Sequence, residues 1–289
     1  MPDYRKNRFT SSRFFRPAHF DSSFSRKESF LPSGLAVKEY RMTAPALAGQ
    51  SFLFFTDTHI QAGIIRNLAS PAGTPRSWHG TGWMTEALQD AVNRFSPDYL
   101  LFGGDLIPYS SLYPDAMRMM AKLKGKRGQF AVFGNWDKRR RFWLPFRVIE
   151  QLYADAGWSL LSNESVSDGV LELYGLDDYK IGIPRVYPAG TSSRFRLLLS
   201  HNPDAIADLS PEELTQFDLA LCGHTHGGQI RIPGFGAIKA SSRHWKRFEY
   251  GAYENRQANL KLIVSSGIGT TFLHYRINCP PEIVLLNFF

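Results

Sequence analysis

Short apolar segments alternate with longer segments of helical pattern along residues 35–289, which predicts an α/β domain. The predicted strands cover residues 52–56, 99–102, 130–133, 170–174, 195–200, 219–222, 262–265 and 283–286. Helices are predicted between several of these strands, at residues 83–95, 112–123, 144–156 and 203–209. Because helices that follow strands bring the strand ends into a common crevice, we expect a ligand site at that edge of the sheet.

The first 34 residues have a different pattern, so we divide the chain into an N-terminal arm, residues 1–34, and one domain, residues 35–289. The arm interleaves basic and aromatic residues, namely Arg5, Lys6, Arg8, Arg13, Arg16, Arg26 and Lys27 with Phe9, Phe14, Phe15, Phe20, Phe24 and Phe30. Cationic side chains attract anionic lipid and aromatic rings settle at its interface, so the arm predicts contact with an acidic membrane surface. A disordered tail and an arm packed on the domain are the alternatives.

The formal net charge of +8 indicates an anionic partner. Nucleic acid, an acidic membrane surface and a phosphorylated substrate all fit, and charge does not choose among them. The two cysteines, Cys222 and Cys279, form no disulfide framework, which favours a reducing compartment. No segment has the pattern of a membrane span or of a secretory signal, so we expect a cytoplasmic protein with peripheral contact at the inner face of the membrane.

Residues that can bind metal ions follow the ends of the predicted strands. They are Asp57, His59, Asp105, Asn135, His201, His224 and His226. A lone strand-end aspartate is usually a turn or cap residue, and a lone histidine usually packs locally. Five such segments in series instead favour a metal site, and the mixture of imidazole and carboxylate suits zinc, iron or manganese. Two pairs, Asp57 with His59 and His224 with His226, lie two residues apart, so each pair points to one side of an extended chain and can bind one ion or two neighbouring ions.

The order of these motifs resembles the calcineurin-like metallophosphoesterases, whose signature runs D-x-H, GD, GN-H-D or E, a separate His, then GH-x-H. The match extends over residues 51–229. The string at residues 223–229, together with residues 265–269 and 281–283, resembles the branch that includes a bacterial UDP-2,3-diacylglucosamine pyrophosphatase of lipid A synthesis. The resemblance implies a two-sheet sandwich flanked by helices, a four-layer αββα fold, with metal ions at the strand ends.

The resemblance also implies which residues hold two divalent ions, for which we expect manganese, with iron or zinc as alternatives. Asp57, His59 and His226 would hold the first ion, Asn135, His201 and His224 would hold the second, and Asp105 would bridge them. Two such ions can activate a bound water and order an in-line displacement at phosphorus. The predicted nucleophile is therefore a metal-bound water and not a side chain.

One position departs from the family pattern, because Trp136 stands where the family usually has a histidine. Indole has no proton that titrates near neutral pH, so Trp136 cannot act as a general acid. Acid help matters most for a basic leaving oxygen, whereas cleavage of a phosphoanhydride releases a phosphate monoester with a second pKa of about 6. The departure thus favours a diphosphate substrate. His79, His244 and His274 are the other candidate proton donors.

Basic residues directly after this motif are candidates for binding an anionic substrate. Trp136, Arg139 and Arg140 are the predicted substrate contacts. The indole would stack on a base or sugar, or else fill space in the pocket wall, and a solvated charge run is the alternative for the arginines. A second basic group, residues 243–247, is a comparable candidate.

Together these features predict a hydrolase that cleaves UDP-2,3-diacylglucosamine to UMP and 2,3-diacylglucosamine 1-phosphate. The first alternative is a general phosphodiesterase or nuclease of the same family, to which the basic charge would also contribute. No nucleic-acid-binding module is recognisable, which makes nucleic acid the weaker partner. The second alternative is a metal-binding protein that has lost catalysis together with the missing histidine.

Overall fold

Two seven-stranded sheets pack face to face in the computed structural model, which describes residues 11–60, 64–69, 77–108, 112–139, 144–188, 195–271 and 273–289. The first sheet has the order β1 (Phe15–Pro17), β16 (Gly251–Asn255), β17 (Leu260–Val264), β13 (Leu219–Cys222), β12 (Phe195–Leu199), β11 (Leu171–Gly175) and β10 (Glu164–Ser167). The second sheet has the order β2 (Phe24–Phe30), β3 (Ala36–Met42), β19 (Glu282–Phe288), β4 (Ser51–Phe55), β7 (Tyr99–Phe102), β8 (Gly128–Val132) and β9 (Ser159–Leu161).

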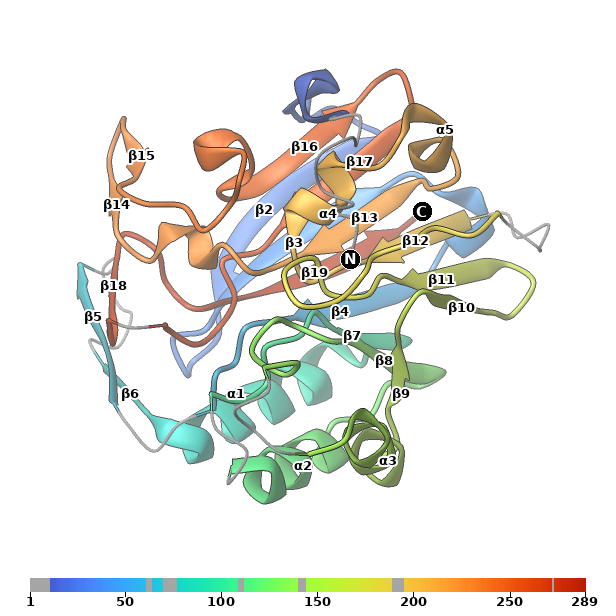
Figure 1. Cartoon of the computed structure of the whole chain (residues 1–289). Coiled ribbons are helices and arrows are strands. Elements are labelled where there is room, and N and C mark those ends of the chain that lie inside the picture. The colour runs from blue at the N-terminus through green and yellow to red at the C-terminus, as the bar shows by residue number, and fades with distance from the viewer. Residues whose placement is uncertain are drawn as a thin grey trace.

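Helices cover the outer face of each sheet, so the architecture is the expected αββα sandwich (Figure 1). The helices α1 (Gly80–Phe95), α2 (Tyr113–Lys122) and α3 (Phe146–Asp155) pack on the second sheet, and the short helices α4 (Pro203–Ala207) and α5 (Pro211–Leu214) lie on the first. Four 3₁₀ turns are also described: η1 (Ser11–Phe14), η2 (Pro45–Leu47), η5 (His226–Gly228) and η6 (Trp245–Phe248).

Two small sheets lie outside the sandwich. One has the order β18 (Tyr275–Ile277), β5 (Ile64–Ala69) and β6 (Ser77–His79), and the other is the hairpin of β14 (Arg231–Ile232) and β15 (Gly236–Ala237). Figure 1 shows both at the same side of the molecule.

The apolar pattern of the central strands explains the layers. In β4, Phe52 and Phe54 lie in the core between the two sheets, whereas Leu53 and Phe55 lie in the core between the sheet and α1 to α3. Successive side chains of a strand point to opposite faces, so a continuously apolar strand can bury both. Strand β12 does the same, since Leu197 faces the other sheet and Leu198 faces the helices.

Parallel pairing brings the strand ends together. In the second sheet β4, β7 and β8 are parallel neighbours, and in the first sheet β11, β12, β13 and β17 are. The carboxyl ends of β4, β7, β8, β12 and β13 carry all the predicted metal ligands, so the topology assembles the site at one edge of the sandwich.

The predicted strands and helices are confirmed within a few residues at each end. Strand β3 was not predicted, because Lys38, Glu39 and Arg41 interrupt its apolar pattern. Lys38 is nevertheless buried and paired with Glu28 on the neighbouring β2, which allows a charged residue inside the sheet.

The described part of the predicted N-terminal arm, residues 11–34, packs against both sheets. Strand β1 pairs with β16 at one edge, and β2 pairs with β3 at another. Phe15 and Phe24 are buried there, while Arg16 and Arg26 are exposed. The boundary at residue 34 and the contact with lipid stay predictions. Among the described helices, none is both long enough and apolar enough to cross a membrane.

Candidate functional site

Two groups of buried side chains at the strand ends could each hold a metal ion. Asp57, His59 and His226 form the first, and Asp105, His201 and His224 form the second; within each group the ligand atoms lie within 4.8 Å of one another. The structure therefore brings together all six of the predicted carboxylate and imidazole ligands.

Asp105 belongs to the second group and also contacts the first. One of its carboxylate oxygens, Oδ2, is 3.4 Å from Nε2 of His59 and 3.3 Å from Nε2 of His201. The other oxygen, Oδ1, accepts a hydrogen bond of 2.7 Å from the backbone N–H of Trp136, the residue that follows Asn135. This is the arrangement expected of a carboxylate that bridges two ions.

The backbone of the ligands is strained. Asp57, His59, Asp105, His224 and His226 have φ angles of 53°, 39°, 57°, 69° and 52°, in the left-handed region that residues with a Cβ atom rarely adopt. Such conformations concentrate at functional sites, where the surrounding structure holds them. Here each one turns the chain sharply at the end of a strand and directs the next ligand back toward the same centre.

Two glycines are required by the close packing of these turns. A Cβ atom on Gly134 would lie 2.2 Å from Oδ1 of Asp105, and one on Gly223 would lie 2.2 Å from Oδ2 of Asp57. No other residue fits at either position without displacing a carboxylate.

The donor set fits metal ions, because several buried polar atoms lack a partner. Oδ1 of Asp57, Nε2 of His59 and Oδ1 of Asn135 are buried and make no hydrogen bond with the described residues. A buried polar atom without a partner costs free energy, and native structures rarely tolerate several in one place. Carboxylate, imidazole and amide oxygen are ligands of manganese, iron and zinc, so these ions would satisfy all three atoms.

Burial and the neighbouring charges shift the pKa values of the ligands. Burial raises the pKa of Asp57 to about 6, and burial lowers the pKa of His59 to about 4. Burial likewise opposes a charged His201, but the carboxylates of Asp105 and Asp57 raise its pKa to about 10. Burial also opposes a charged Asp105, but the charge of His201 lowers the pKa of Asp105. Without metal, Asp57 thus favours a proton of its own and Asp105 relies on the proton of His201, and divalent cations would replace both protons.

The ligands are oriented by a shell of hydrogen bonds. Nδ1 of His201 is 2.8 Å from the carbonyl oxygen of Gly103, and Nε2 of His224 is 3.1 Å from that of Ser241. Oδ2 of Asp57 accepts hydrogen bonds from the backbone N–H of His224 and from the hydroxyl of Thr56, both at 2.8 Å. Such contacts fix the orientation of a ligand before an ion binds.

Asp137 supports the site and was not among the predicted ligands. Its carboxylate accepts three backbone hydrogen bonds, from Gly134 at 2.9 Å, from Asp105 at 2.8 Å and from Leu106 at 3.0 Å. It thereby ties the turn after β8 to the turn after β7. The signal was present in the sequence, because the family motif allows an acidic residue at this position.

Arg276 is a second supporting residue, and no motif of the sequence predicts its role. The guanidinium is fully buried and donates hydrogen bonds to the carbonyl oxygens of Ser266, Gly267, Gly269 and Cys279. The loop that it holds contacts the first metal group, since the N–H of Gly269 donates to the carbonyl oxygen of Asp57 at 2.7 Å.

The predicted substrate contacts stay predictions, and the structure places two of them, Trp136 and Arg139, near the first metal group. Trp136 lies edge-on to the ring of His59, with the two ring centroids 5.7 Å apart. The guanidinium of Arg139 lies 4.0 Å from the ring centroid of Trp136. Arg140 lies outside the described residues. Lys138 of the same basic run is buried and paired with Asp177, so it is a structural cation.

The other candidate cations and proton donors are held elsewhere. Arg243 and His244 of the second basic group both contact the carboxylate of Asp208, at 3.3 and 3.4 Å. Nδ1 of His274 is 3.5 Å from the hydroxyl of Thr270, and the side chain of His79 lies outside the described part of the chain. Neither His244 nor His274 belongs to the two metal groups.

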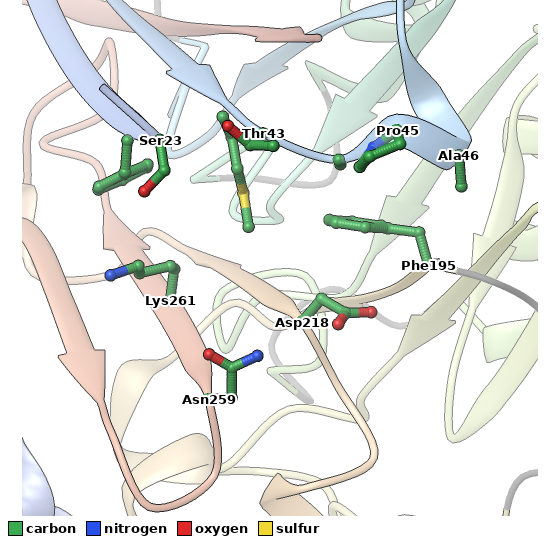
Figure 2. A pocket seen from close by; sticks show the side chains of 11 residues that line it. Ser23, Thr43, Pro45, Ala46, Phe195, Asp218, Asn259 and Lys261 are labelled. Carbon is green, nitrogen blue, oxygen red and sulfur yellow. The ribbon is translucent and has the colours of Figure 1, made fainter. Parts of the chain in front are cut away.

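A cavity of about 300 Å³ lies at the opposite end of the sandwich, where β12 and β13 begin (Figure 2). Figure 2 shows Ser23 and Thr43 on one side of it and Asp218 and Lys261 on the other. Asp218 accepts a hydrogen bond from the backbone of Arg196, and Lys261 is paired with Glu254, so both charges are already engaged. The cavity therefore offers no counterpart to the unpartnered groups of the metal site.

Comparison with known proteins agrees with this geometry. The sequence profile of the calcineurin-like phosphoesterase family matches residues 51–228. The chain is 32% identical over 205 residues to the phosphodiesterase YaeI of Escherichia coli (strain K12), an alignment that covers 66% of this chain and 70% of that protein. It is 30% identical over 209 residues to the uncharacterized metallophosphoesterase YkuE of Bacillus subtilis (strain 168), covering 68% and 69%.

Among solved structures, a dimetal phosphatase from Danio rerio superposes with a TM-score of 0.42 and 14% sequence identity, covering 75% of this chain and 87% of that one.

Proposed function

This chain belongs to the calcineurin-like phosphoesterase family and is a metal-dependent phosphoesterase, and we propose that it cleaves the phosphoanhydride of UDP-2,3-diacylglucosamine. The products would be UMP and 2,3-diacylglucosamine 1-phosphate. The observation that carries the hydrolytic part is the pair of three-residue metal groups joined by Asp105.

In this proposal Asp57, His59 and His226 hold one ion, Asn135, His201 and His224 hold the other, and Asp105 contacts both. When bound, two divalent ions activate water and neutralise phosphoryl oxygens. Manganese is the proposed metal, with iron or zinc as the alternatives that the same ligands accept.

The chain's own residues supply orientation. The backbone contacts of His201 and His224 fix the direction of the imidazoles, and the Asp137 carboxylate keeps the turns that carry Asp105 and Asn135 at a constant separation. Arg139 adds a positive charge at the rim of the first group, where it can meet a phosphate oxygen of the substrate.

Trp136 supports the choice of an anhydride. It lies beside His59, within the site, at a position from which a histidine could protonate a leaving group. Since indole cannot do so, the site suits a leaving group that needs little protonation, which a phosphate monoester is and an alkoxide is not.

The lipid-linked substrate also accounts for the proposed peripheral contact with the inner face of the membrane. Arg16, Arg26 and Lys27 are exposed at the edges of the sheets, and in this proposal they contact anionic lipid, for which Lys27 would exchange its ion pair with Glu39. Binding to vesicles that contain anionic lipid, lost on replacing these three residues with serine, would support that contact.

A general phosphodiesterase is the second candidate, and it is favoured by the similarity to the phosphodiesterase YaeI of Escherichia coli. Nucleic acid would be one such substrate, to which the net charge of +8 contributes non-specific attraction. Salt-dependent binding to unrelated oligonucleotides would favour that version.

One comparison separates the two candidates. The purified protein is incubated with and without manganese, with UDP-2,3-diacylglucosamine and separately with bis-p-nitrophenyl phosphate, and release of UMP and of nitrophenol is measured. Manganese-dependent UMP release with little diester cleavage supports the anhydride hydrolase. Diester cleavage without UMP release refutes it and supports the phosphodiesterase.

A further inference from the structure

A groove of about 310 Å³ opens directly beside the first metal group. Its lining residues are Thr225, His226, Gly228, Gln229, Ile230, Ile238, Lys239, Ser241, Thr271 and Leu273. His226 therefore belongs both to the metal group and to the wall of the groove. A substrate whose phosphate lies at the metal group has its substituent within reach of this groove.

Three polar side chains of the groove, those of Thr225, Gln229 and Thr271, are already bonded to the protein. Gln229 donates to the carbonyl oxygens of Leu273 and Tyr275, at 2.8 and 3.2 Å, and its own oxygen accepts from Thr271, at 2.6 Å from the backbone and 3.1 Å from the hydroxyl. The hydroxyl of Thr225 donates to the carbonyl oxygen of Glu249 at 2.7 Å. These groups hold the walls in place and have little capacity left for a ligand.

Three of the remaining lining residues are aliphatic, and the exposed Ser241 and Lys239 lie in the same lining. Ile230 is half-buried, whereas Ile238 and Leu273 are exposed by 52% and 54%, which is unusual for side chains of this size. Ile238 follows β15, and Leu273 precedes β18, so two segments distant in the sequence supply the exposed aliphatic side chains of the groove. A ligand that covers them would remove apolar surface from water.

One cation completes the groove. Lys239 lies next to Ile238 in the lining, and no described carboxylate lies within ion-pair distance of its ammonium. The groove thus combines branched aliphatic walls, an ammonium group and a neighbouring metal group, which is the chemistry of a phosphorylated amphiphile.

We propose that this groove binds the aliphatic chain of an amphiphilic phosphoester whose phosphate lies at the metal groups. The proposal rests on the proposed phosphoester hydrolysis and adds the part of the substrate that the groove selects. A nucleobase suits the groove poorly, since its donors and acceptors would face aliphatic walls and a glutamine that is already bonded. An aliphatic chain brings no donor or acceptor of its own to the aliphatic walls.

The test uses a series of uridine 5′-diphosphate n-alkyl esters, with methyl, butyl and octyl groups, and measures release of UMP in the presence of manganese. Burial of one methylene group is equivalent to about a fourfold change when complete and about twofold when half complete. The open groove should therefore raise kcat/KM of the butyl ester about 8- to 60-fold above that of the methyl ester. A ratio near one overturns the proposal.

Substitutions in the groove test where the alkyl chain of the substrate binds. In Ile238→Ser and Leu273→Ser, the butyl-to-methyl ratio should fall by at least about threefold in each, because each removes part of the aliphatic wall. The matched control is Ile232→Ser, an isoleucine exposed by 48% on β14 that does not line the groove, and its ratio should stay at the wild-type value. A high ratio that none of the three variants changes would place the chain elsewhere and also overturn the proposal.

Binding separates this inference from the proposed function. Methyl, butyl and octyl phosphate are titrated calorimetrically into the manganese-loaded protein. If no ester is cleaved but affinity rises with chain length and falls in Ile238→Ser, the groove is supported and the anhydride hydrolase is not. If the methyl ester is cleaved and neither rate nor affinity depends on chain length, hydrolysis stands and the groove does not.

Discussion

Replacing Arg276 with methionine should destabilise the fold and weaken metal binding together, because a single buried guanidinium holds the loop beside Asp57. Its hydrogen bonds end on four carbonyl oxygens, and no carboxylate of the described chain pairs with it. The loop in turn contacts the metal site through two hydrogen bonds, from Ile268 to the carbonyl oxygen of Thr56 at 3.1 Å and from Gly269 to that of Asp57 at 2.7 Å.

The size of the effect follows from the carbonyl groups that lose a donor. The carbonyl oxygen of Gly267 keeps a hydrogen bond from the N–H of Glu282, so Ser266, Gly269 and Cys279 are the three that depend on Arg276. A buried acceptor left without a partner costs about 1–3 kcal/mol. Some relaxation and entry of water is expected, so Arg276→Met should lower the free energy of unfolding by about 3–5 kcal/mol.

Metal affinity should fall as well, because the loop determines where the backbone of Asp57 lies. Residues that orient a ligand without touching the ion typically change affinity by about 10- to 100-fold. We expect a loss of this size for the ion held by Asp57, His59 and His226.

The assays are urea denaturation of the metal-free protein and competition of manganese against a fluorescent chelator. Arg276→Lys keeps the positive charge but has fewer donors, so its loss of stability should be intermediate. Arg256→Met is the surface control, since its side chain is 75% exposed and its ion pair with Glu254 contributes at most about 1 kcal/mol. A stability loss below about 1 kcal/mol in Arg276→Met, or unchanged manganese affinity, would refute the reasoning.

Three further substitutions test the site. Asp105→Ala should abolish turnover and remove at least one ion per chain by elemental analysis, and a variant that kept two ions and full activity would exclude the bridging role. Gly223→Ala places a Cβ atom 2.2 Å from Oδ2 of Asp57 and should cost about 1–3 kcal/mol in urea denaturation, whereas Gly82→Ala in α1, with nothing within 4 Å, should be neutral or stabilising. Trp136→His should raise hydrolysis of 2′,3′-cyclic AMP by up to about 100-fold and change UMP release from UDP-2,3-diacylglucosamine little; equal effects on both substrates would contradict the leaving-group argument.

Much of the fold was predictable because its central strands are apolar on both faces. Residues 52–55 and 197–199 form continuous apolar runs that end at a polar residue, and the structure buries each run between a helix layer and the opposite sheet. The edge elements carried no such signal. Strands β1 and β2 mix exposed Arg and Lys with single buried phenylalanines, so their role as sheet edges emerges only from pairing with β16 and β3.

The candidate site was predictable for a different reason. Its ligands stand at the ends of successive strands, and parallel pairing converts this order in the sequence into proximity in space. Supporting residues lack that regularity. Arg276 lies in a segment whose pattern resembles a surface loop, and only the fold shows that its charge is buried against backbone carbonyls.

The strained ligands connect the stability of the fold with the chemistry of the site. Five left-handed residues at about 1–2 kcal/mol each represent a conformational cost comparable to the stability of a whole domain. Hydrogen bonds such as those from Gly269 to Asp57 and from Leu106 and Asp105 to the Asp137 carboxylate offset part of it. Ions that bind the unpartnered atoms of Asp57, His59 and Asn135 would offset more, since their binding free energy adds to that of folding. A pair of resident cations explains both the strained backbone of these ligands and the buried ligand atoms that make no hydrogen bond with the described residues, whereas a role in folding explains neither.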